Sequence, residues 1–173
     1  MGRTRTVPDV EVYAVIRQLL LAGGDKAVAF SSVARATGLA APTLVQRYGS
    51  RDGMVRAALA HAWDELDART SEIAADCPMS AKGAAQLLKL LGGTDASPVD
   101  LGLLAADVRD PALRDRALSW RETVESSLAA RLGGGAKGRT AAAILFAAWQ
   151  GQSLWSPAGG RGFKLKDAVK RLA

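Results

Sequence analysis

The chain has 173 residues, of which 49% are hydrophobic and 23% are charged, with a formal net charge of +6. This length permits one sizeable core or a small head joined to a larger bundle, and the longest apolar run, residues 141–149, is far too short to span a membrane. The first residues contain no apolar segment typical of a secretory signal, and a single cysteine excludes an internal disulfide. We therefore expect a folded, cytoplasmic protein with no membrane association.

Positive charge is concentrated at the two ends of the chain. Residues 1–52 hold seven Lys or Arg against four Asp or Glu, residues 53–160 hold eleven against twelve, and residues 161–173 hold five against one. A basic head beside a near-neutral middle favours nucleic-acid binding through one end, although a merely basic surface would give the same count. The basic tail fits a solvated helix face, with a second DNA contact as the alternative.

The first helix is predicted close to the amino terminus. Thr6, three residues ahead of Asp9, is typical of a helix start. Apolar residues follow at helical spacing until the pair Gly23-Gly24, which ends the helix. Arg3 and Arg5 lie ahead of this helix, where a frayed terminus and an arm on the DNA are both open.

Residues 30–56 are the most informative stretch of the chain. They predict a short helix, a sharp turn at Gly38, a second short helix and the start of a third. Leu39 and Leu44 are expected to fill the angle between the two short helices, which leaves one face of the second helix outside. This is the helix-turn-helix arrangement, whose second helix can enter a DNA major groove.

A motif within this stretch resembles the signature of TetR-family transcriptional regulators. It runs Val33-Ala34-x-x-x-Gly38-Leu39-x-x-Pro42-Thr43-Leu44-x-x-x-Tyr48-x-Ser50-Arg51. In that family a Thr-Leu pair, an aromatic residue four positions after the Leu and a Ser-Arg type pair close the DNA-binding head. The resemblance covers about the first third of the chain tightly, and beyond it only the helical pattern and the element order match.

The resemblance implies a set of residues in contact with DNA phosphates or bases. They are Ser31, Ser32, Ala41, Pro42, Thr43, Val45, Gln46, Arg47, Tyr48 and Arg51. Gln46 can read adenine through paired hydrogen bonds, and the apolar side chains at positions 41 and 45 can contact a thymine methyl group. The two serines fit a helix cap as well as a phosphate contact.

Two positions depart from the family pattern. Val45 stands where the family usually has a phosphate-contacting Tyr, and Ala40 stands where a Ser or Thr usually caps the second short helix. Loss of that cap costs roughly 1 kcal/mol, although Pro42 near the helix start partly compensates because it presets φ.

The rest of the chain is predicted to be helical. A long helix capped by Ser50 should end near Cys77 and, by the resemblance, join the head to the regulatory body. Five further helical stretches follow, separated by Gly or Pro, over residues 81–91, 98–107, 111–132, 139–155 and 165–172. We expect an all-α fold of about nine helices, with an N-terminal helix-turn-helix three-helix head over residues 1–52 and a C-terminal helical bundle over residues 53–173 for ligand binding and dimerisation.

Residues 140–155 are almost continuously small and apolar. A helix that is apolar all round must be buried on all sides. In TetR-like proteins the last two long helices form a four-helix dimer interface, and the resemblance assigns to it Ala143, Ala147, Gly151, Leu154, Leu165 and Val169. A central core helix within one subunit is the alternative.

Aromatic and amide side chains on these helices could line an apolar ligand cavity. The predicted pocket residues are Trp63, Trp120, Phe146, Trp149 and Gln150, with Met79, Gln152 and Trp155 as further candidates. Aromatic residues on buried helix faces are more often plain core, so both interpretations stay open. Because few charged residues fall on the apolar faces, the expected effector is a neutral or lipophilic small molecule.

An enzymatic function has no support in the sequence. His61 is the only histidine and makes no plausible zinc site with Cys77, and no Gly-rich phosphate loop follows a strand. We expect no catalytic residue, no metal and no cofactor. The sequence predicts a homodimeric DNA-binding regulator, most simply a repressor that a small molecule releases from a palindromic operator. The alternatives are a protein-interaction module or a small-molecule-binding helical protein with a non-functional DNA head.

Overall fold

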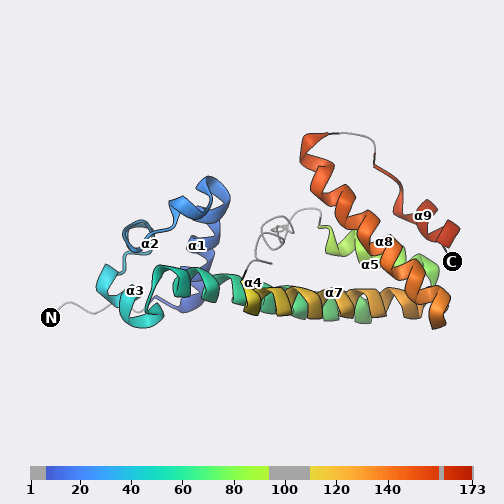
Figure 1. Cartoon of the computed structure of the whole chain (residues 1–173), viewed down its shortest axis with the longest axis horizontal. Helices are drawn as coiled ribbons and strands as arrows, with labels where there is room; N and C mark the ends of the chain where they lie inside the picture. The colour runs from blue at the N-terminus through green and yellow to red at the C-terminus, as the bar shows by residue number, and fades with distance from the viewer. Residues whose placement is uncertain (1–6, 94–109, 160–161, 173) are drawn as a thin grey trace. The chain divides into compact units, whose positions relative to one another are not determined.

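The computed structural model describes residues 7–93, 110–159 and 162–172. All regular structure in these ranges is helical (Figure 1), which confirms the predicted all-α class. The helix predicted over residues 98–107, the Thr6 cap and the arm with Arg3 and Arg5 lie outside the described residues.

Eight α-helices occupy the described ranges. They are α1 (Asp9–Gly23), α2 (Phe30–Thr37), α3 (Ala41–Tyr48), α4 (Arg51–Asp76), α5 (Ala81–Leu91), α7 (Pro111–Arg131), α8 (Gly135–Trp155) and α9 (Leu165–Leu172), with short 3-10 turns at η1 (Asp25–Ala27) and η3 (Ser156–Ala158). The predicted bounds agree closely with these except at α8, which begins at Gly135 instead of Arg139. The reason is that the backbone break, with positive φ at Gly133 and Gly134, precedes a helical bond from the Gly138 N–H to the Gly134 carbonyl.

The chain divides into two compact units between Asp64 and Glu65, inside α4. The boundary predicted between residues 52 and 53 lies near the start of the same helix. The first unit holds α1 to α3 and the first part of α4, and the second unit holds the remainder of the described chain.

The first unit is built around one apolar core. Val12, Ile16 and Leu20 recur every four residues along α1 and are all buried, as a helix with one apolar stripe requires. Val33 of α2 and Leu44 of α3 are fully buried. Gly38 ends α2 at φ 75°, the left-handed conformation that the predicted turn requires, and its N–H donates to the Ala34 carbonyl.

The second unit packs α7 against α8 and α5 against α9. Two of its helix starts have side-chain caps: the Ser80 hydroxyl accepts from the Gly83 N–H at 3.3 Å, and the Asp110 carboxylate accepts from the Ala112 N–H at 3.0 Å. The core of this unit contains Leu87, Leu88, Leu113, Trp120, Val124, Leu128, Ala142, Leu145, Phe146, Trp149 and Val169.

A buried arginine closes the end of α4. Arg131 is only 6% exposed, and its guanidinium donates to the carbonyls of Ala74 and Cys77 at 2.5 and 3.0 Å. It also donates to the Ser127 hydroxyl at 2.7 Å. The last carbonyls of a helix have no partner within the helix, so Arg131 of α7 fixes where α4 ends.

Candidate nucleic-acid interface

The outward face of α3 is the first part of the candidate interface. Leu44 is fully buried under this helix, while Pro42, Val45 and Gln46 are exposed, with Val45 at 44%. Ala41 and Thr43 are half-buried. No side chain caps the helix at Ala40, and Pro42 lies in its first turn, as the sequence suggests. The helix therefore presents a short row of uncharged side chains to solvent.

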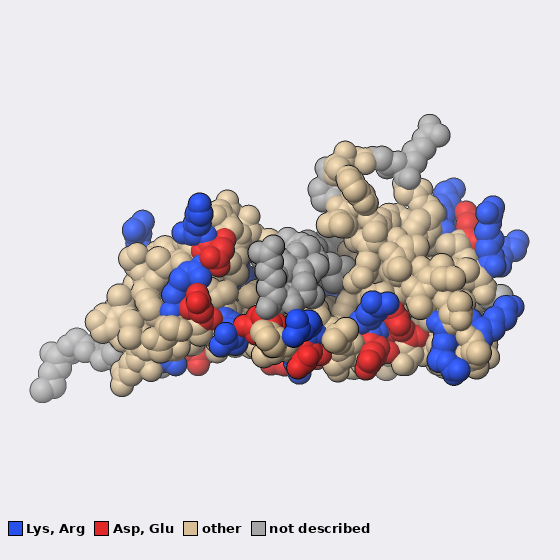
Figure 2. All heavy atoms as spheres, in the orientation of Figure 1, with Lys and Arg blue, Asp and Glu red and all other residues tan. Residues whose placement is uncertain are grey.

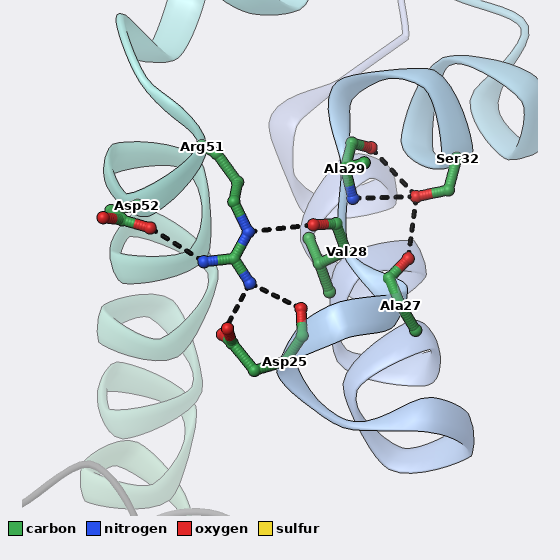
Figure 3. Close-up of polar contacts among 7 residues, drawn as sticks. All are labelled: Asp25, Ala27, Val28, Ala29, Ser32, Arg51 and Asp52. Atoms are coloured by element: carbon green, nitrogen blue, oxygen red, sulfur yellow. Dashed lines mark hydrogen bonds and ion pairs between the residues drawn. The ribbon is translucent and has the colours of Figure 1, made fainter.

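Ser32 is engaged inside the first unit. Its hydroxyl accepts from the Ala29 N–H and lies 2.9 Å from the carbonyls of Ala27 and Ala29 (Figure 3). Because the hydroxyl already serves the start of α2, this geometry supports the capping interpretation of Ser32. The neighbouring Ser31 is exposed.

An acid at the start of α1 ties down the end of α3. The Tyr48 hydroxyl donates to the Asp9 carboxylate at 2.6 Å, and the Arg47 guanidinium donates to the Val7 carbonyl at 2.8 Å and lies 3.4 Å from the same carboxylate. We call Asp9, Arg47 and Tyr48 the Asp9 cluster. Burial, followed by the hydrogen bond to Asp9, raises the pKa of Tyr48 well above its ordinary value of 10. The sequence indicates Asp9 only as a helix-start acid, and no signal in it reveals this contact.

Arg51 joins the start of α4 to the segment that precedes α2. Its Nε donates to the Val28 carbonyl at 2.9 Å, and its Nη2 lies 2.5 Å from the Asp25 carbonyl and 2.6 Å from the Asp25 carboxylate. Its Nη1 lies 2.8 Å from the Asp52 carboxylate, so all three guanidinium nitrogens have partners within the chain (Figure 3). The sequence assigns Arg51 to phosphate; the structure gives it a place in holding the head together. The hydrogen bond to Asp25 is the largest cause that raises the pKa of Arg51.

The long helix that follows is capped as predicted. The Ser50 hydroxyl accepts from the Gly53 N–H at 3.0 Å. The predicted DNA-contacting residues therefore lie on α2, α3 and the first turn of α4, in one unit. Pro42, Val45 and Gln46 are exposed without a hydrogen bond from their side chains to another described residue, whereas Ser32, Arg47, Tyr48 and Arg51 are engaged within the unit.

Three of the predicted pocket residues form one aromatic cluster in the second unit. The ring centroids of Trp120 and Phe146 are 5.7 Å apart, and those of Phe146 and Trp149 are 5.8 Å apart. All three are buried, and the Trp120 indole donates to the Thr70 hydroxyl at 2.8 Å. Gln150 is exposed, and Trp63 is buried in the first unit. This packing is that of a filled core.

The predicted dimer residues of α8 lie on one face of that helix. Ala147 and Leu154 are exposed and Ala143 and Gly151 are half-buried, while Ile144 and Trp155 of the same face are 51% and 69% exposed. The opposite face is buried against α7, so within the chain the helix is covered on one side and not on all sides. On α9, Leu165 is half-buried and Val169 is 2% exposed, in the helix that packs on α5. Val169 therefore has no free surface for a partner.

In residues 7–93, 110–159 and 162–172, no helix combines the length and the apolarity that crossing a bilayer requires. The same ranges contain no group of three or more His, Cys, Asp or Glu placed to hold a metal ion.

Solved structures share this arrangement of helices. A transcriptional regulator from Rhodococcus sp. Rha1 superposes with a TM-score of 0.76 at 22% identity, over 96% of this chain and 94% of that chain. The multidrug binding protein EbrR, in complex with malachite green, superposes with a TM-score of 0.70 at 23% identity, over 96% of each chain.

A third solved structure is described as a regulator of the TetR/AcrR family. A transcriptional regulator of the TetR/AcrR family from Thermobifida fusca superposes with a TM-score of 0.64 at 19% identity, over 95% of this chain and 93% of that chain. No family model matches the sequence, and no curated protein matches it. The chain thus has the fold of TetR/AcrR-family transcriptional regulators, which confirms the fold expected from the motif in residues 33–51.

Proposed function

We propose that this protein is a sequence-specific DNA-binding transcriptional regulator. The observation that carries the proposal is the outward face of α3, held in a helix-turn-helix by the buried Leu44 and the left-handed Gly38. An α-helix with its side chains is roughly 10–12 Å across, and a B-DNA major groove is about 12 Å wide. The helix can therefore enter the groove with its exposed row toward the bases.

Base recognition is assigned to the exposed side chains of α3. The Gln46 carboxamide can donate to and accept from adenine, and the Val45 methyl groups can contact a thymine methyl. Neither side chain forms a hydrogen bond to another described residue, and both are exposed. Binding DNA would therefore not require either of them to break a contact within the chain.

Phosphate contact is assigned to Arg47 in preference to Arg51. The pair between Arg47 and Asp9 is 3.4 Å long with side chains 27% and 54% exposed, and an exposed pair of this kind contributes only about 0–1 kcal/mol. To reach a phosphate, Arg47 would give up this weak ion pair and its hydrogen bond to the Val7 carbonyl. Arg51 would have to leave contacts with Asp25, Val28 and Asp52.

We assign dimerisation to the exposed face of α8. This face carries Ile144, Ala147, Gly151, Leu154 and Trp155, a continuous apolar row that the chain itself leaves open to solvent. A two-fold dimer would place two copies of α3 in successive major grooves roughly 34–36 Å apart, which suits a palindromic operator.

We further propose that a small apolar molecule releases the protein from DNA, as expected of a repressor. EbrR, which shares the fold, is described as a multidrug binding protein in complex with malachite green. A ligand that binds better to the conformer with unsuitable spacing of the α3 helices lowers the population that fits the operator.

The test is selection of DNA fragments from the source genome by the purified full chain, followed by titration of the selected fragment at two salt concentrations. We expect a palindromic site whose affinity falls as salt rises. Gln46→Ala should change the preferred sequence, and Arg47→Ala should weaken binding to all sequences and reduce the salt dependence. Recovery of no fragment above background would contradict the proposal and favour a protein-interaction role.

A further inference from the structure

The second unit carries an open groove that the proposed regulator function does not use. It has a volume of about 650 Å³ and lies between α5, α8 and the segment that leads into α9. Its apolar surface comes from Ala85 and Leu90 of α5 and from Phe163, and three lysines, Lys89, Lys164 and Lys166, also line it. Leu90 and Phe163 are 41% and 36% exposed, so apolar atoms are open to solvent here.

One wall of the groove is held in place by α8. The Gln152 carboxamide oxygen accepts from the Phe163 N–H at 3.2 Å. The preceding Gly162 passes so close to the Gln152 side chain that a Cβ at position 162 would overlap the carboxamide. This glycine and this amide together position Phe163 and Lys164 at the groove.

The charged residues that line the groove are all positive. Its lining residues include three lysines and no acid. Among the described residues, no ion pair joins Lys89, Lys164 or Lys166 to a carboxylate. In Figure 2, Lys and Arg side chains, with an acidic side chain among them, gather at the right-hand end of the view, where Figure 1 places α9. Unpaired like charges close together attract an anion.

We propose that this groove binds a small organic anion with an apolar body, of the class of medium-chain carboxylates. Its volume lies within the roughly 300–1,000 Å³ typical of small-molecule sites. The chain of such a molecule would cover Leu90 and Phe163, and its carboxylate would lie among the three lysines. Neither a neutral nor a cationic amphiphile would satisfy the lysines.

The groove is separate from the surfaces assigned above. Gln152 follows Gly151 directly and so points about 100° around α8 from it, away from the centre of the exposed apolar face. All groove residues belong to the second unit. Ligand binding in the groove can be measured without DNA. Absence of ligand binding would therefore contradict the groove proposal alone, and absence of DNA binding would contradict the regulator proposal alone.

The experiment is calorimetric titration of the full chain with decanoate and with decyltrimethylammonium, both below their micellar concentrations. We expect saturable binding of decanoate and at least tenfold weaker binding of the cation. Octanoate is two CH₂ groups shorter, and each buried CH₂ contributes about 0.8 kcal/mol, so it should bind roughly fifteenfold more weakly than decanoate.

Matched variants locate the site. The triple variant Lys89→Gln, Lys164→Gln and Lys166→Gln should weaken decanoate binding at least tenfold. The control variant Lys82→Gln, Lys170→Gln and Arg171→Gln removes the same charge from α5 and α9 outside the groove and should change affinity less than twofold.

A third variant tests the apolar part of the groove. Ala85→Trp, which adds volume at a half-buried lining position, should abolish decanoate binding while circular dichroism and thermal melting show a folded chain. Equal loss in the two charge variants, or unchanged binding in the groove triple variant, would overturn the proposal. Affinity that falls as protein concentration rises would show that a second copy occupies the groove and would also overturn it.

Discussion

Replacement of Gly83 by alanine should destabilise the second unit, although alanine is the better helix former. Gly83 lies in the first turn of α5, directly over the turn at Pro78. A Cβ at this position would lie 2.8 Å from the Pro78 carbonyl carbon and 3.2 Å from its nitrogen, with the carbonyl oxygen nearer still. The first distance is 0.6 Å shorter than the 3.4 Å at which ordinary contact begins.

The size of the destabilisation follows from the contacts that the turn at Pro78 would lose if it shifted to make room for the alanine Cβ. Overpacking of this kind costs about 1–3 kcal/mol. A shift of the turn also weakens the Ser80 N–H bond to the Pro78 carbonyl and the Ser80 hydroxyl cap on the Gly83 N–H, at about 1 kcal/mol each. The gain in helix propensity returns only about 1 kcal/mol. The net loss is therefore about 3 kcal/mol, which corresponds to a decrease in Tm of roughly 6–12 °C for a chain of this size.

The assay is urea unfolding followed by circular dichroism at 222 nm, with Gly92→Ala as the control. Gly92 ends the same helix at φ −69°, and a Cβ there would meet its nearest neighbours at 3.4 Å, which is ordinary contact. Gly92→Ala should therefore leave stability unchanged or raise it by up to about 1 kcal/mol. The reasoning would be refuted by a Gly83→Ala chain as stable as the wild type, or by equal losses in both variants.

Two further predictions concern the proposed dimer and the Asp9 cluster. Ala147→Arg, on the exposed apolar face of α8, should convert the dimer to a monomer in sedimentation analysis, whereas Gln150→Arg at the edge of that face should not; dissociation by both or by neither would contradict the assigned face. The raised pKa of Tyr48 means that the folded chain keeps the phenol proton where the unfolded chain, with a pKa near 10, loses it. This stabilisation is complete below pH 10 and is lost as pH rises above 10, so urea unfolding between pH 9 and 11.5 should show falling stability that Tyr48→Phe largely removes. A wild-type chain whose stability does not change over that range would contradict it.

The helices were predictable because local signals mark their ends. The Gly92-Gly93 pair marks the end of α5, and Gly38 marks the turn of the helix-turn-helix, since helix ends and positive φ depend on residues adjacent in sequence. The partners of Arg47 and Arg51 were not predictable in the same way. A cation near a helix end gives the same pattern whether its partner is a phosphate or a carboxylate from 26 or 38 residues earlier in the chain.

For a related reason, the sequence did not show that the rest of the chain covers only one side of α8. The helix carries small apolar side chains of its own on all sides. Its sequence pattern therefore predicts burial on all sides, but it does not show which side the rest of the chain covers. The structure resolves this because Phe146 and Trp149 pack inward, while Ile144 and Trp155 stay exposed. The groove beside α5 was likewise not predictable, since Lys89 lies on α5 while Lys164 and Lys166 lie just before and within α9, more than 70 residues later in the chain.

The internal partners of Arg47 and Arg51 have a consequence for how the head would search a genome. Asp9, Asp25 and Asp52 pair with these two arginines, so two of the seven positive charges counted in residues 1–52 already have carboxylate partners within the chain. Counterion release supplies most of the affinity for random sequence. An arginine that stays paired with a carboxylate, as Arg51 does with Asp25 and Asp52, adds nothing to this release, so a larger share of the operator affinity would come from the base edges that α3 contacts.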